Sequence, residues 1–405
     1  MDPSGIRIED FNYPLPDERI AKYPLAQRDG SKLLYLNKGQ ISERKFSKIP
    51  DLLPDNALLL FNETRVIQAR LPFKKSTGAR IEIFCLEPVE PVNDFQLAFQ
   101  QKPPVVWKCL VGNARRWKNE TLEVKMQIRN QEVRLFAEKK EKFSDAFLVS
   151  FSWEPEDISF ADILESSGLT PLPPYLHREA EAFDKTRYQT VYARLNGSVA
   201  APTAGLHFTE AVLNRLDEKG IDKDKLILHV GAGTFKPVSA ETIGEHEMHT
   251  EQIRVPTETI KHLYRAADKF IIPVGTTSMR SLESLFWMAL RIRLGEDHVF
   301  SVSQWDPYQL EIPEDFSARK ALEILISKAE QEKTTVLKGE TQLMIVPGYR
   351  FRFAKGLITN FHQPKSTLLL LVSALIGDKW KEAYDFALQN DFRFLSYGDS
   401  CLFLP

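Results

Sequence analysis

The sequence has little cysteine and no long hydrophobic run. Its 405 residues include three widely spaced cysteines, Cys85, Cys109 and Cys401. These form neither a disulfide framework nor a zinc site, so a reducing compartment is expected. The longest apolar segment, Leu368 to Ile376, is too short to span a bilayer, and residues 1–10 lack the apolar stretch of a signal peptide. We therefore expect a cytoplasmic protein with no membrane partner.

A strong net charge is also absent. The chain has 53 Lys+Arg and 55 Asp+Glu, a formal charge of −2. Low-complexity tracts and internal repeats are missing as well. With 43% hydrophobic and 27% charged residues, a chain of this length can bury a large core, and we expect two or three domains.

One part of the chain has the period of β-strands. Residues 121–129 alternate strictly between apolar and polar side chains, and Asn130 and Gln131 turn the chain towards Val133 and Leu135, which predicts a β-hairpin. The segments 80–86, 105–111 and 146–153 have similar patterns. The predicted fold class is therefore a mixed α/β (α+β) protein: a discontinuous α/β catalytic core, residues 1–70 and 151–405, with a small all-β barrel inserted at residues 71–150.

The predicted insertion is basic. Residues 65–150 contain 16 Lys+Arg and 10 Asp+Glu, a charge of +6, so the remainder of the chain carries −8. Runs such as Arg115-Arg116-Trp117-Lys118 are often only solvated loops. The alternative is a module that contacts phosphates, because RNA affinity depends on local positive charge.

Polar or small residues follow several predicted strands outside the insertion. Asn62, Thr64 and Arg65 follow the apolar run 57–61, at the strand end where ligands bind in open α/β sheets. A short strand at 199–201 leads through a loop with His207 and Phe208 to a helix at 210–219, with Thr209 as N-cap and Gly220 as the end.

Two further units have the same form. A strand at 269–274 precedes Thr276 and Thr277 and an amphipathic helix at 279–291, which contains Arg280. A strand at 356–361 precedes His362 and Lys365 and a helix capped by Ser366 or Thr367 and ended by Gly377. If the strands of the three units are parallel, their loops converge on one edge of one sheet, where we expect the active site.

Two glycines after a predicted strand at 226–230 suggest a dinucleotide-binding turn. The third glycine of that motif would fall at Lys236, followed by Pro237, so the motif is excluded. The glycines instead indicate a close approach of the backbone to a ligand or to another strand.

His246, His249 and Glu251 form the last candidate cluster. Their spacing matches neither a helical zinc motif nor a single strand face for all three residues, so no metal is expected. His249 and Glu251 share a face of an extended segment, where a carboxylate orients an imidazole and raises its basicity. We predict that they form a general base and its orienting group.

Long motifs in this sequence resemble the S-adenosylmethionine:tRNA ribosyltransferase-isomerase family, in the family's order and over nearly the whole chain. Two positions depart from the family pattern, Gln363 and Ala180, and the segments 88–120 and 287–340 match loosely. The principal motifs are FNETRV (61–66), RYQTVYA (187–193), GSVAAPTAGLHFT (197–209), LHVGAGTFKPV (228–238), HEMHTE (246–251), GTTSMR (275–280), TNFHQPKST (359–367) and SYGD (396–399).

The resemblance implies a reaction and its substrates. The ribosyl group of S-adenosylmethionine is transferred to the 7-aminomethyl-7-deazaguanine in a tRNA anticodon and rearranged to epoxyqueuosine, with release of adenine and methionine. S-adenosylmethionine is then a co-substrate, no tightly bound cofactor is implied, and we expect a monomer. The alternatives are a tRNA methyltransferase, which would release S-adenosylhomocysteine, and a non-catalytic RNA-binding protein.

This chemistry assigns roles to the motif residues. Hydrogens on C5′ beside a sulfonium are acidic, so His249 or His207 is the expected base. Arg280, with Thr276 and Thr277, is expected to bind the methionine carboxylate. Aromatic faces for adenine and the target base are expected from Phe208, Phe235 and Tyr397. The remaining expected substrate contacts are Asn62, Thr64, Arg65, Asn360, His362, Lys365 and Asp399.

Overall fold

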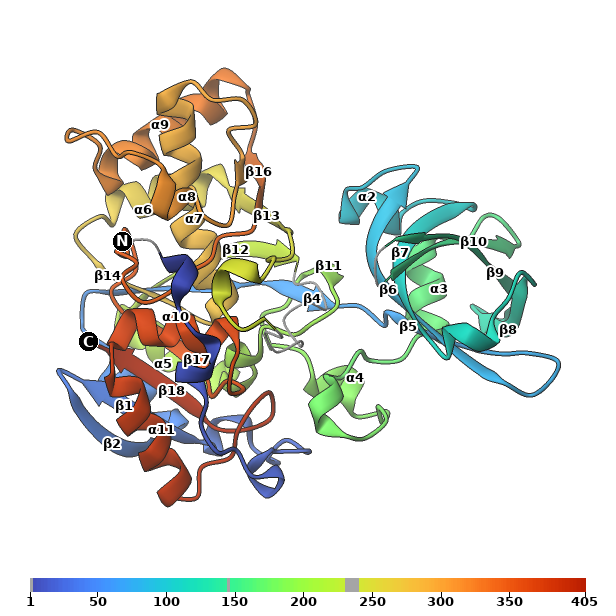
Figure 1. Ribbon diagram of the computed structural model, residues 1–405, viewed down its shortest axis with the longest axis horizontal. Helices are drawn as coiled ribbons and strands as arrows, with labels where there is room; N and C mark the ends of the chain where they lie inside the picture. Colours follow the sequence, from blue (N-terminus) through green and yellow to red (C-terminus); the bar gives the residue numbers. More distant parts are fainter. Residues whose placement is uncertain (1–2, 144–145, 230–239) are drawn as a thin grey trace.

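The computed structural model describes residues 3–143, 146–229 and 240–405. Figure 1 shows a large α/β lobe and a separate barrel lobe, with strands β4 (Thr64–Val66) and β11 (Leu195–Ser198) between them. The fold class predicted from the sequence, a mixed α/β core with a small inserted β-barrel, is confirmed.

A six-stranded mixed sheet runs through the large lobe in the order β14-β3-β12-β13-β16-β15. Strand β3 pairs in parallel with β14 and β12, and its six residues are all buried, as expected for a continuous apolar run covered on both faces. The strands are β3 (Ala57–Asn62), β12 (Asp222–His229), β13 (Glu251–Pro256), β14 (Phe270–Pro273), β15 (Ser301–Val302) and β16 (Val336–Thr341).

A second sheet of four strands has the order β17-β18-β1-β2. It meets the first sheet at a parallel bridge between Val274 and Ile358. This bridge brings the end of β14 next to β17. The strands are β1 (Lys32–Asn37), β2 (Gln40–Lys45), β17 (Leu357–Asn360) and β18 (Ser400–Leu404).

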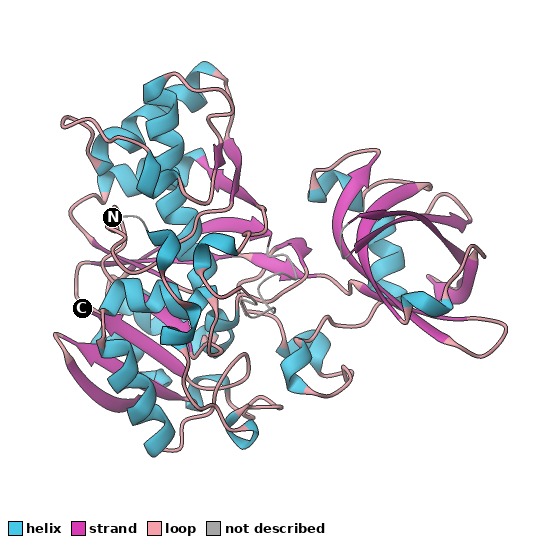
Figure 2. Cartoon of the chain, viewed as in Figure 1, coloured by secondary structure: helices cyan, strands magenta, loops and turns pink. Residues whose placement is uncertain are grey.

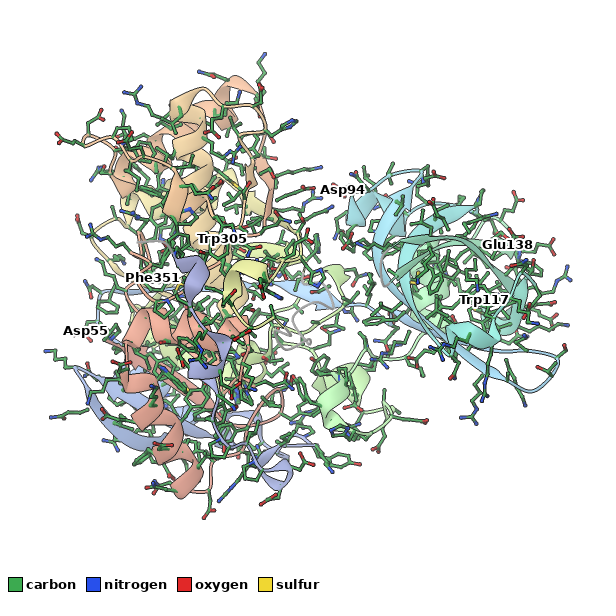
Figure 3. All side chains as sticks on the ribbon, in the orientation of Figure 1. Asp55, Asp94, Trp117, Glu138, Trp305 and Phe351 are labelled. Carbon is green, nitrogen blue, oxygen red and sulfur yellow. The ribbon has the colours of Figure 1, made fainter. Side chains whose placement is uncertain are left out.

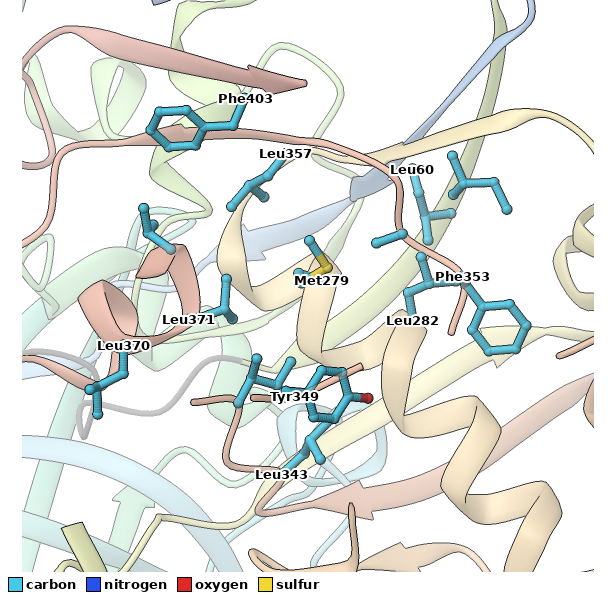
Figure 4. Close-up of a cluster of buried hydrophobic side chains, with 14 of the residues drawn as sticks. Leu60, Met279, Leu282, Leu343, Tyr349, Phe353, Leu357, Leu370, Leu371 and Phe403 are labelled. Carbon is cyan, nitrogen blue, oxygen red and sulfur yellow. The ribbon is translucent and has the colours of Figure 1, made fainter. Parts of the chain in front are cut away.

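Helix α7 (Thr276–Leu294) is the centre of the large lobe. Every residue from Thr276 to Leu290 is buried, and Figure 4 shows Met279 and Leu282 among side chains of β3, β17 and α10. The sequence predicted an amphipathic helix starting at Met279. Both details are wrong, because the helix starts three residues earlier, at Thr276, and is covered on all sides as far as Leu290. The other helices of this lobe are α1 (Ile49–Leu52), α4 (Asp184–Arg187), α5 (Glu210–Glu218), α6 (Thr257–Arg265), α8 (Asp306–Gln309), α9 (Ala318–Gln331), α10 (Thr367–Ile376) and α11 (Lys379–Gln389).

The barrel lobe is an antiparallel sheet in the order β5-β6-β7-β10-β9-β8 (Figure 2). The predicted hairpin is confirmed, because β8 pairs with β9, but the turn lies one residue earlier than predicted: Arg129 and Asn130 turn the chain with φ of 50° and 65°. The elements are β5 (Arg70–Lys74), β6 (Arg80–Glu90), β7 (Val105–Gly112), β8 (Leu122–Ile128), β9 (Gln131–Phe143), β10 (Ala146–Glu154), α2 (Phe95–Phe99) and α3 (Phe160–Ser167).

The barrel has a hydrophobic core of its own, which contains Trp107, Phe151, Trp153 and Phe160. The domain boundaries at residues 70 and 150 stay a prediction. The lobe is held against the large lobe at Asp94, which lies on the side of the barrel that faces it in Figure 3. The Asp94 carboxylate accepts bonds from Arg254 (2.8 Å) and Lys338 (2.9 Å). Among the described residues, no helix is long and apolar enough to cross a membrane.

Candidate active site

Three loops converge on one cavity in the large lobe. They are the turn from β14 into α7, the turn from β17 into α10, and residues 200–204 after β11; Tyr175 and Ser396 complete the wall. The cavity holds about 700 Å³ of space between side chains, part of it open to solvent. The sequence predicted that these loops converge at one edge of one sheet if their strands are parallel; the loops do converge, but not from one sheet. The three strands lie in three sheets, and the Val274–Ile358 bridge brings two of them together.

The N-terminus of α7 forms one wall of the cavity. Gly275 has a φ of +93°, a conformation that favours glycine, and its N–H donates to Ile358 O at 2.8 Å. The first-turn N–H groups of a helix have no partner within it, and the helix dipole makes this end positive. Thr276 and Thr277 line the cavity here, and the buried Thr277 Oγ1 has no hydrogen-bond partner among the described residues. This wall is suited to an anionic oxygen.

His362 brings an imidazole to the same cavity. Its Nε2 lies 2.9 Å from Thr359 Oγ1, and its backbone N–H donates to the Tyr384 hydroxyl at 3.1 Å. Burial lowers the pKa of His362 to about 3. The ring is therefore neutral at neutral pH and keeps a lone pair for a proton.

His207 lies behind the cavity and lines a second, smaller pocket next to it. Asn360 Nδ2 donates to His207 Nε2 at 3.2 Å, and this assigns the ring proton to Nδ1, which faces Ser31 Oγ at 2.8 Å. The amide orientation agrees, because Asn360 Nδ2 also donates to Leu395 O at 3.0 Å. Burial, with Arg393 and Arg28 nearby, lowers the pKa of His207 to about 3. With both nitrogens engaged, His207 positions its neighbours and is a poor general base.

The predicted pair of His249 and Glu251 does not form a base and its orienter. Strand β13 begins at Glu251, so the alternation that buries Glu251, Ile253 and Val255 does not extend back to His249, which is exposed. Glu251 instead forms a buried ion pair with Arg280. Arg280 does not line the cavity, and its Nη2 is buried with no partner among the described residues, so its predicted contact with the methionine carboxylate stays a prediction.

Two of the predicted aromatic contacts, Phe208 and Tyr397, do not line the cavity. Phe208 is fully buried and packs edge-on against Phe46 and Phe61, with ring centroids 4.9 and 5.1 Å away. Tyr397 donates from its hydroxyl to Asp184 Oδ1 at 2.7 Å, beside the smaller pocket. Phe235 lies outside the described residues.

The residues after β3 also differ from their predicted roles. Asn62 is completely buried and supports the backbone: Nδ2 donates to Leu228 O at 3.1 Å, and Oδ1 accepts from the N–H groups of Thr64 and Leu228. Thr64 is buried and Arg65 is exposed on β4. None of the three lines the cavity, because β3 runs through the interior of the sheet.

Lys365 and Asp399 make structural contacts. Lys365 has a φ of 56°, and its ammonium group pairs with Glu9 at 2.6 Å. Asp399 is buried and accepts from the backbone N–H groups of Lys32 (2.9 Å) and Arg393 (2.7 Å). Burial raises the pKa of Asp399 above its ordinary value.

The sequence-based selection therefore placed four residues on the cavity, Thr276, Thr277, Asn360 and His362. It missed Tyr175 and Ser396, whose hydroxyl oxygens lie 2.6 Å apart. Ser396 stands in a recognised motif, but nothing in the sequence singles out Tyr175. Among residues 3–143, 146–229 and 240–405 no group of His, Cys, Asp or Glu could hold a metal ion.

Known proteins are similar to this chain over nearly its whole length. A family model described as queuosine biosynthesis protein matches residues 8–403. A protein of Trichlorobacter lovleyi named S-adenosylmethionine:tRNA ribosyltransferase-isomerase is 38% identical over 405 residues, covering 98% of this chain and 99% of that protein. One of the same name from Dechloromonas aromatica is 39% identical over 403 residues, with 98% and 97% covered. The solved S-adenosylmethionine tRNA ribosyltransferase of Thermotoga maritima is 27% identical, with a TM-score of 0.46, and the match covers 97% of this chain and 99% of that one.

Proposed function

Because this chain belongs to the queuosine biosynthesis protein family, we propose that it is an S-adenosylmethionine:tRNA ribosyltransferase-isomerase. It transfers the ribosyl group of S-adenosylmethionine to the 7-aminomethyl-7-deazaguanine of tRNA and rearranges it to epoxyqueuosine. Adenine and methionine leave. S-adenosylmethionine is a co-substrate in this reaction, and no tightly bound cofactor takes part.

The observation that supports this function best is the cavity at the N-terminus of α7. We place the methionine carboxylate of S-adenosylmethionine there, against the first-turn N–H groups and the Thr277 hydroxyl, for which residues 3–143, 146–229 and 240–405 provide no partner. Asn360 Oδ1, which is also buried without a partner among the described residues, offers an acceptor to the same ligand. This assignment replaces Arg280, whose guanidinium group is paired with Glu251.

His362 is the best-placed base. Its ring lines the cavity and is neutral, whereas His249 is exposed outside β13 and His207 has both nitrogens engaged. A neutral imidazole next to the sulfonium accepts one of the acidified C5′ protons and so starts the transfer. Thr359, 2.9 Å from Nε2, holds the ring in place.

Identification of the released small molecules tests the function. The purified protein, S-adenosylmethionine and tRNA that carries 7-aminomethyl-7-deazaguanine should yield adenine and methionine in equal amounts. S-adenosylhomocysteine would instead identify a methyltransferase, and no product would favour a non-catalytic RNA-binding protein. Omission of the tRNA is the control, since release without it would be simple breakdown of the co-substrate.

The setting of the enzyme completes the proposal. The reaction requires tRNA, and three cysteines that are all free and buried suit the cytoplasm. A single chain contains every group used above, so a monomer is expected to be active. The barrel, with its excess of basic residues, is proposed to contact the tRNA.

A further inference from the structure

A second, smaller pocket adjoins the proposed active site and is lined by three arginines. Arg28, Arg187 and Arg393 come from three distant parts of the chain and line a shallow pocket, whose free volume of about 290 Å³ includes space open to solvent. Ser396 lines both this pocket and the active-site cavity. The two pockets are also joined by the hydrogen bond between His207, in the smaller pocket, and Asn360, in the larger one.

Backbone carbonyl oxygens hold the three guanidinium groups in place. Arg28 donates to the carbonyls of Thr186 (3.0 Å) and Leu206 (3.1 Å). Arg187 donates to the carbonyl of Ala26 (3.1 Å), and Arg393 to that of Tyr397 (3.0 Å). A carbonyl orients a guanidinium group but does not neutralise it. The pocket therefore contains fixed positive charge.

Nearby acidic groups compensate only part of this charge. No Asp or Glu is among the described residues that line the pocket. Asp399 is 3.9 Å from Arg393, and its two oxygens accept backbone N–H groups. Asp184, behind Tyr397, pairs with Arg178 at 2.7 Å. Three arginines face one partly engaged carboxylate, so the pocket has an excess of about two positive charges.

Three features of the pocket suit an anionic ligand. Arg187 Nε is buried and has no acceptor among the described residues. Burial and the neighbouring Arg187 lower the pKa of Arg28, as expected for like charges held close together. Ser31 accepts the His207 Nδ1 proton, which leaves its own hydroxyl proton for an oxygen in the pocket.

We propose that this pocket binds a phosphodiester group of the tRNA next to the target nucleotide. Guanidinium groups bind phosphate through paired N–H donors, and three of them with a serine hydroxyl match its oxygens. A phosphate held here fixes the register of the RNA and places the attached nucleoside at the Ser396 edge of the active-site cavity. This inference rests on the proposed function, because only a nucleic-acid substrate supplies the phosphate.

The experiment removes one charge without removing the cavity. Arg187→Gln eliminates a guanidinium group. Arg187→Lys keeps the positive charge but loses the planar pair of N–H donors. The matched control is Arg215→Gln. Arg215 also donates to a backbone carbonyl, Ser47 O, but is neutralised by Asp51 and lies outside the pocket. Binding of the tRNA is measured at several salt concentrations, with a thermal melt of each variant. If Arg187→Gln does not fold, Arg393→Gln takes its place.

Arg187→Gln should weaken tRNA binding about 10–100-fold, the loss of a charge-assisted bond. The slope of log K against log salt should fall by about 0.7–0.9, the value for one phosphate contact. Arg187→Lys should keep the slope with an intermediate affinity, and Arg215→Gln should match the wild type. A folded Arg187→Gln protein with wild-type affinity and slope would overturn the proposal.

The other source of an oxyanion is the carboxylate of S-adenosylmethionine. If the pocket bound it, Arg187→Gln would raise the KM for S-adenosylmethionine alone, and this defect would vanish with decarboxylated S-adenosylmethionine. That result would also overturn the proposal. Release of adenine and methionine by the wild-type protein is measured first, so a failure of the proposed function is seen separately from a failure of the phosphate site.

Discussion

Arg280 on helix α7 and Glu251 at the start of strand β13 form an ion pair inside the protein, with side chains only 5% and 3% exposed. Arg280 Nη1 donates to Glu251 Oε2, and Arg280 Nε donates to Leu343 O at 3.1 Å. The pair joins the central helix to the main sheet. Both residues belong to recognised motifs, and this contact gives them a structural role.

Breaking this pair should destabilise the protein strongly. Glu251→Met removes the carboxylate that pairs with the buried Arg280, and it should lower the free energy of unfolding by about 3–5 kcal/mol. Arg280→Met removes the guanidinium group from the same pair and should also destabilise the protein. The double variant should recover most of that loss, because two apolar side chains replace both charges. Denaturant unfolding of the four proteins in a double-mutant cycle measures the coupling. A stable Arg280→Met enzyme with a raised KM for S-adenosylmethionine would restore the substrate role.

Thr277 should matter for the co-substrate and not for the fold. Thr277→Val keeps the shape but removes a hydroxyl that has no partner in the part of the chain that the structure describes, so its loss should raise the KM for S-adenosylmethionine about 10-fold at unchanged stability. Ser281→Ala is the matched control, since its hydroxyl bonds to Thr277 O within the helix. Equal effects of the two variants would argue against a ligand at this helix end.

His362 should be required for the chemical step. His362→Ala should slow single-turnover formation of adenine about 10²–10⁴-fold while binding of S-adenosylmethionine and the melting temperature are retained. Since the pKa of His362 is about 3, the wild-type rate should show no loss of this base between pH 5 and 8. His249→Ala is the control and should react at the wild-type rate. A normal rate for His362→Ala would exclude His362 as the base.

Buried histidines should make the protein less stable in mild acid. The pKa of His207 is about 3 in the folded protein, while an unfolded histidine has a pKa near ~6.5. Below pH ~6.5 the unfolded chain therefore takes up a proton that the folded chain does not, and stability falls as the pH drops towards 3. His207→Gln should make the free energy of unfolding less dependent on pH in this range. The decrease in slope should correspond to at most one bound proton, or about 1.4 kcal/mol per pH unit. The free energies of unfolding of the wild type and of His207→Gln are measured at pH 7, 6 and 5. The same pH dependence in both proteins would contradict the prediction.

The sequence correctly predicted helices and a hairpin whose ends are fixed by contacts between residues close together in the chain. Thr209 caps α5 through a bond from Val212 N (3.2 Å), and Ser366 caps α10 through Leu369 N (3.2 Å), as their positions predicted. The hairpin of β8 and β9 followed from strict alternation. In each case the stabilising contact lies within a few residues of the signal.

Long-range contacts decided the features that the sequence did not predict. Helix α7 was predicted to be amphipathic, but its serines at 278, 281 and 284 are buried and their hydroxyls bond to carbonyls of Val274, Thr277 and Arg280 one turn earlier. Glu283, also on α7, is buried and accepts the N–H groups of residues 352–354.

Long-range contacts also limited what the sequence could predict about the active site. The recognised motifs contain most of the residues that line the cavity, but they did not tell which side chains face it. That choice depends on partners distant in sequence, such as Arg280 for Glu251 and Asn360 for His207.

The last prediction concerns the basic loop of the barrel. Trp117 is buried in the barrel (Figure 3), and its indole N–H donates to Glu120 O at 2.8 Å. This anchor holds the loop while Arg115, Arg116 and Lys118 on either side are exposed. Of the two interpretations of this run, solvated loop or phosphate contact, the fixed loop favours contact, because less side-chain and backbone freedom is lost on binding.

Replacement of Arg115, Arg116 and Lys118 by glutamate should weaken tRNA binding and flatten its salt dependence, while S-adenosylmethionine binding stays intact. A matched control makes the same charge change at Arg44, Lys45 and Lys48, which are exposed at β2 and just after it, on the side of the large lobe away from the barrel (Figure 1). Because both variants change the net charge by the same six units, a general electrostatic effect would weaken both equally. A loss confined to the barrel variant places the tRNA on the barrel, and equal losses would identify the loop as merely solvated.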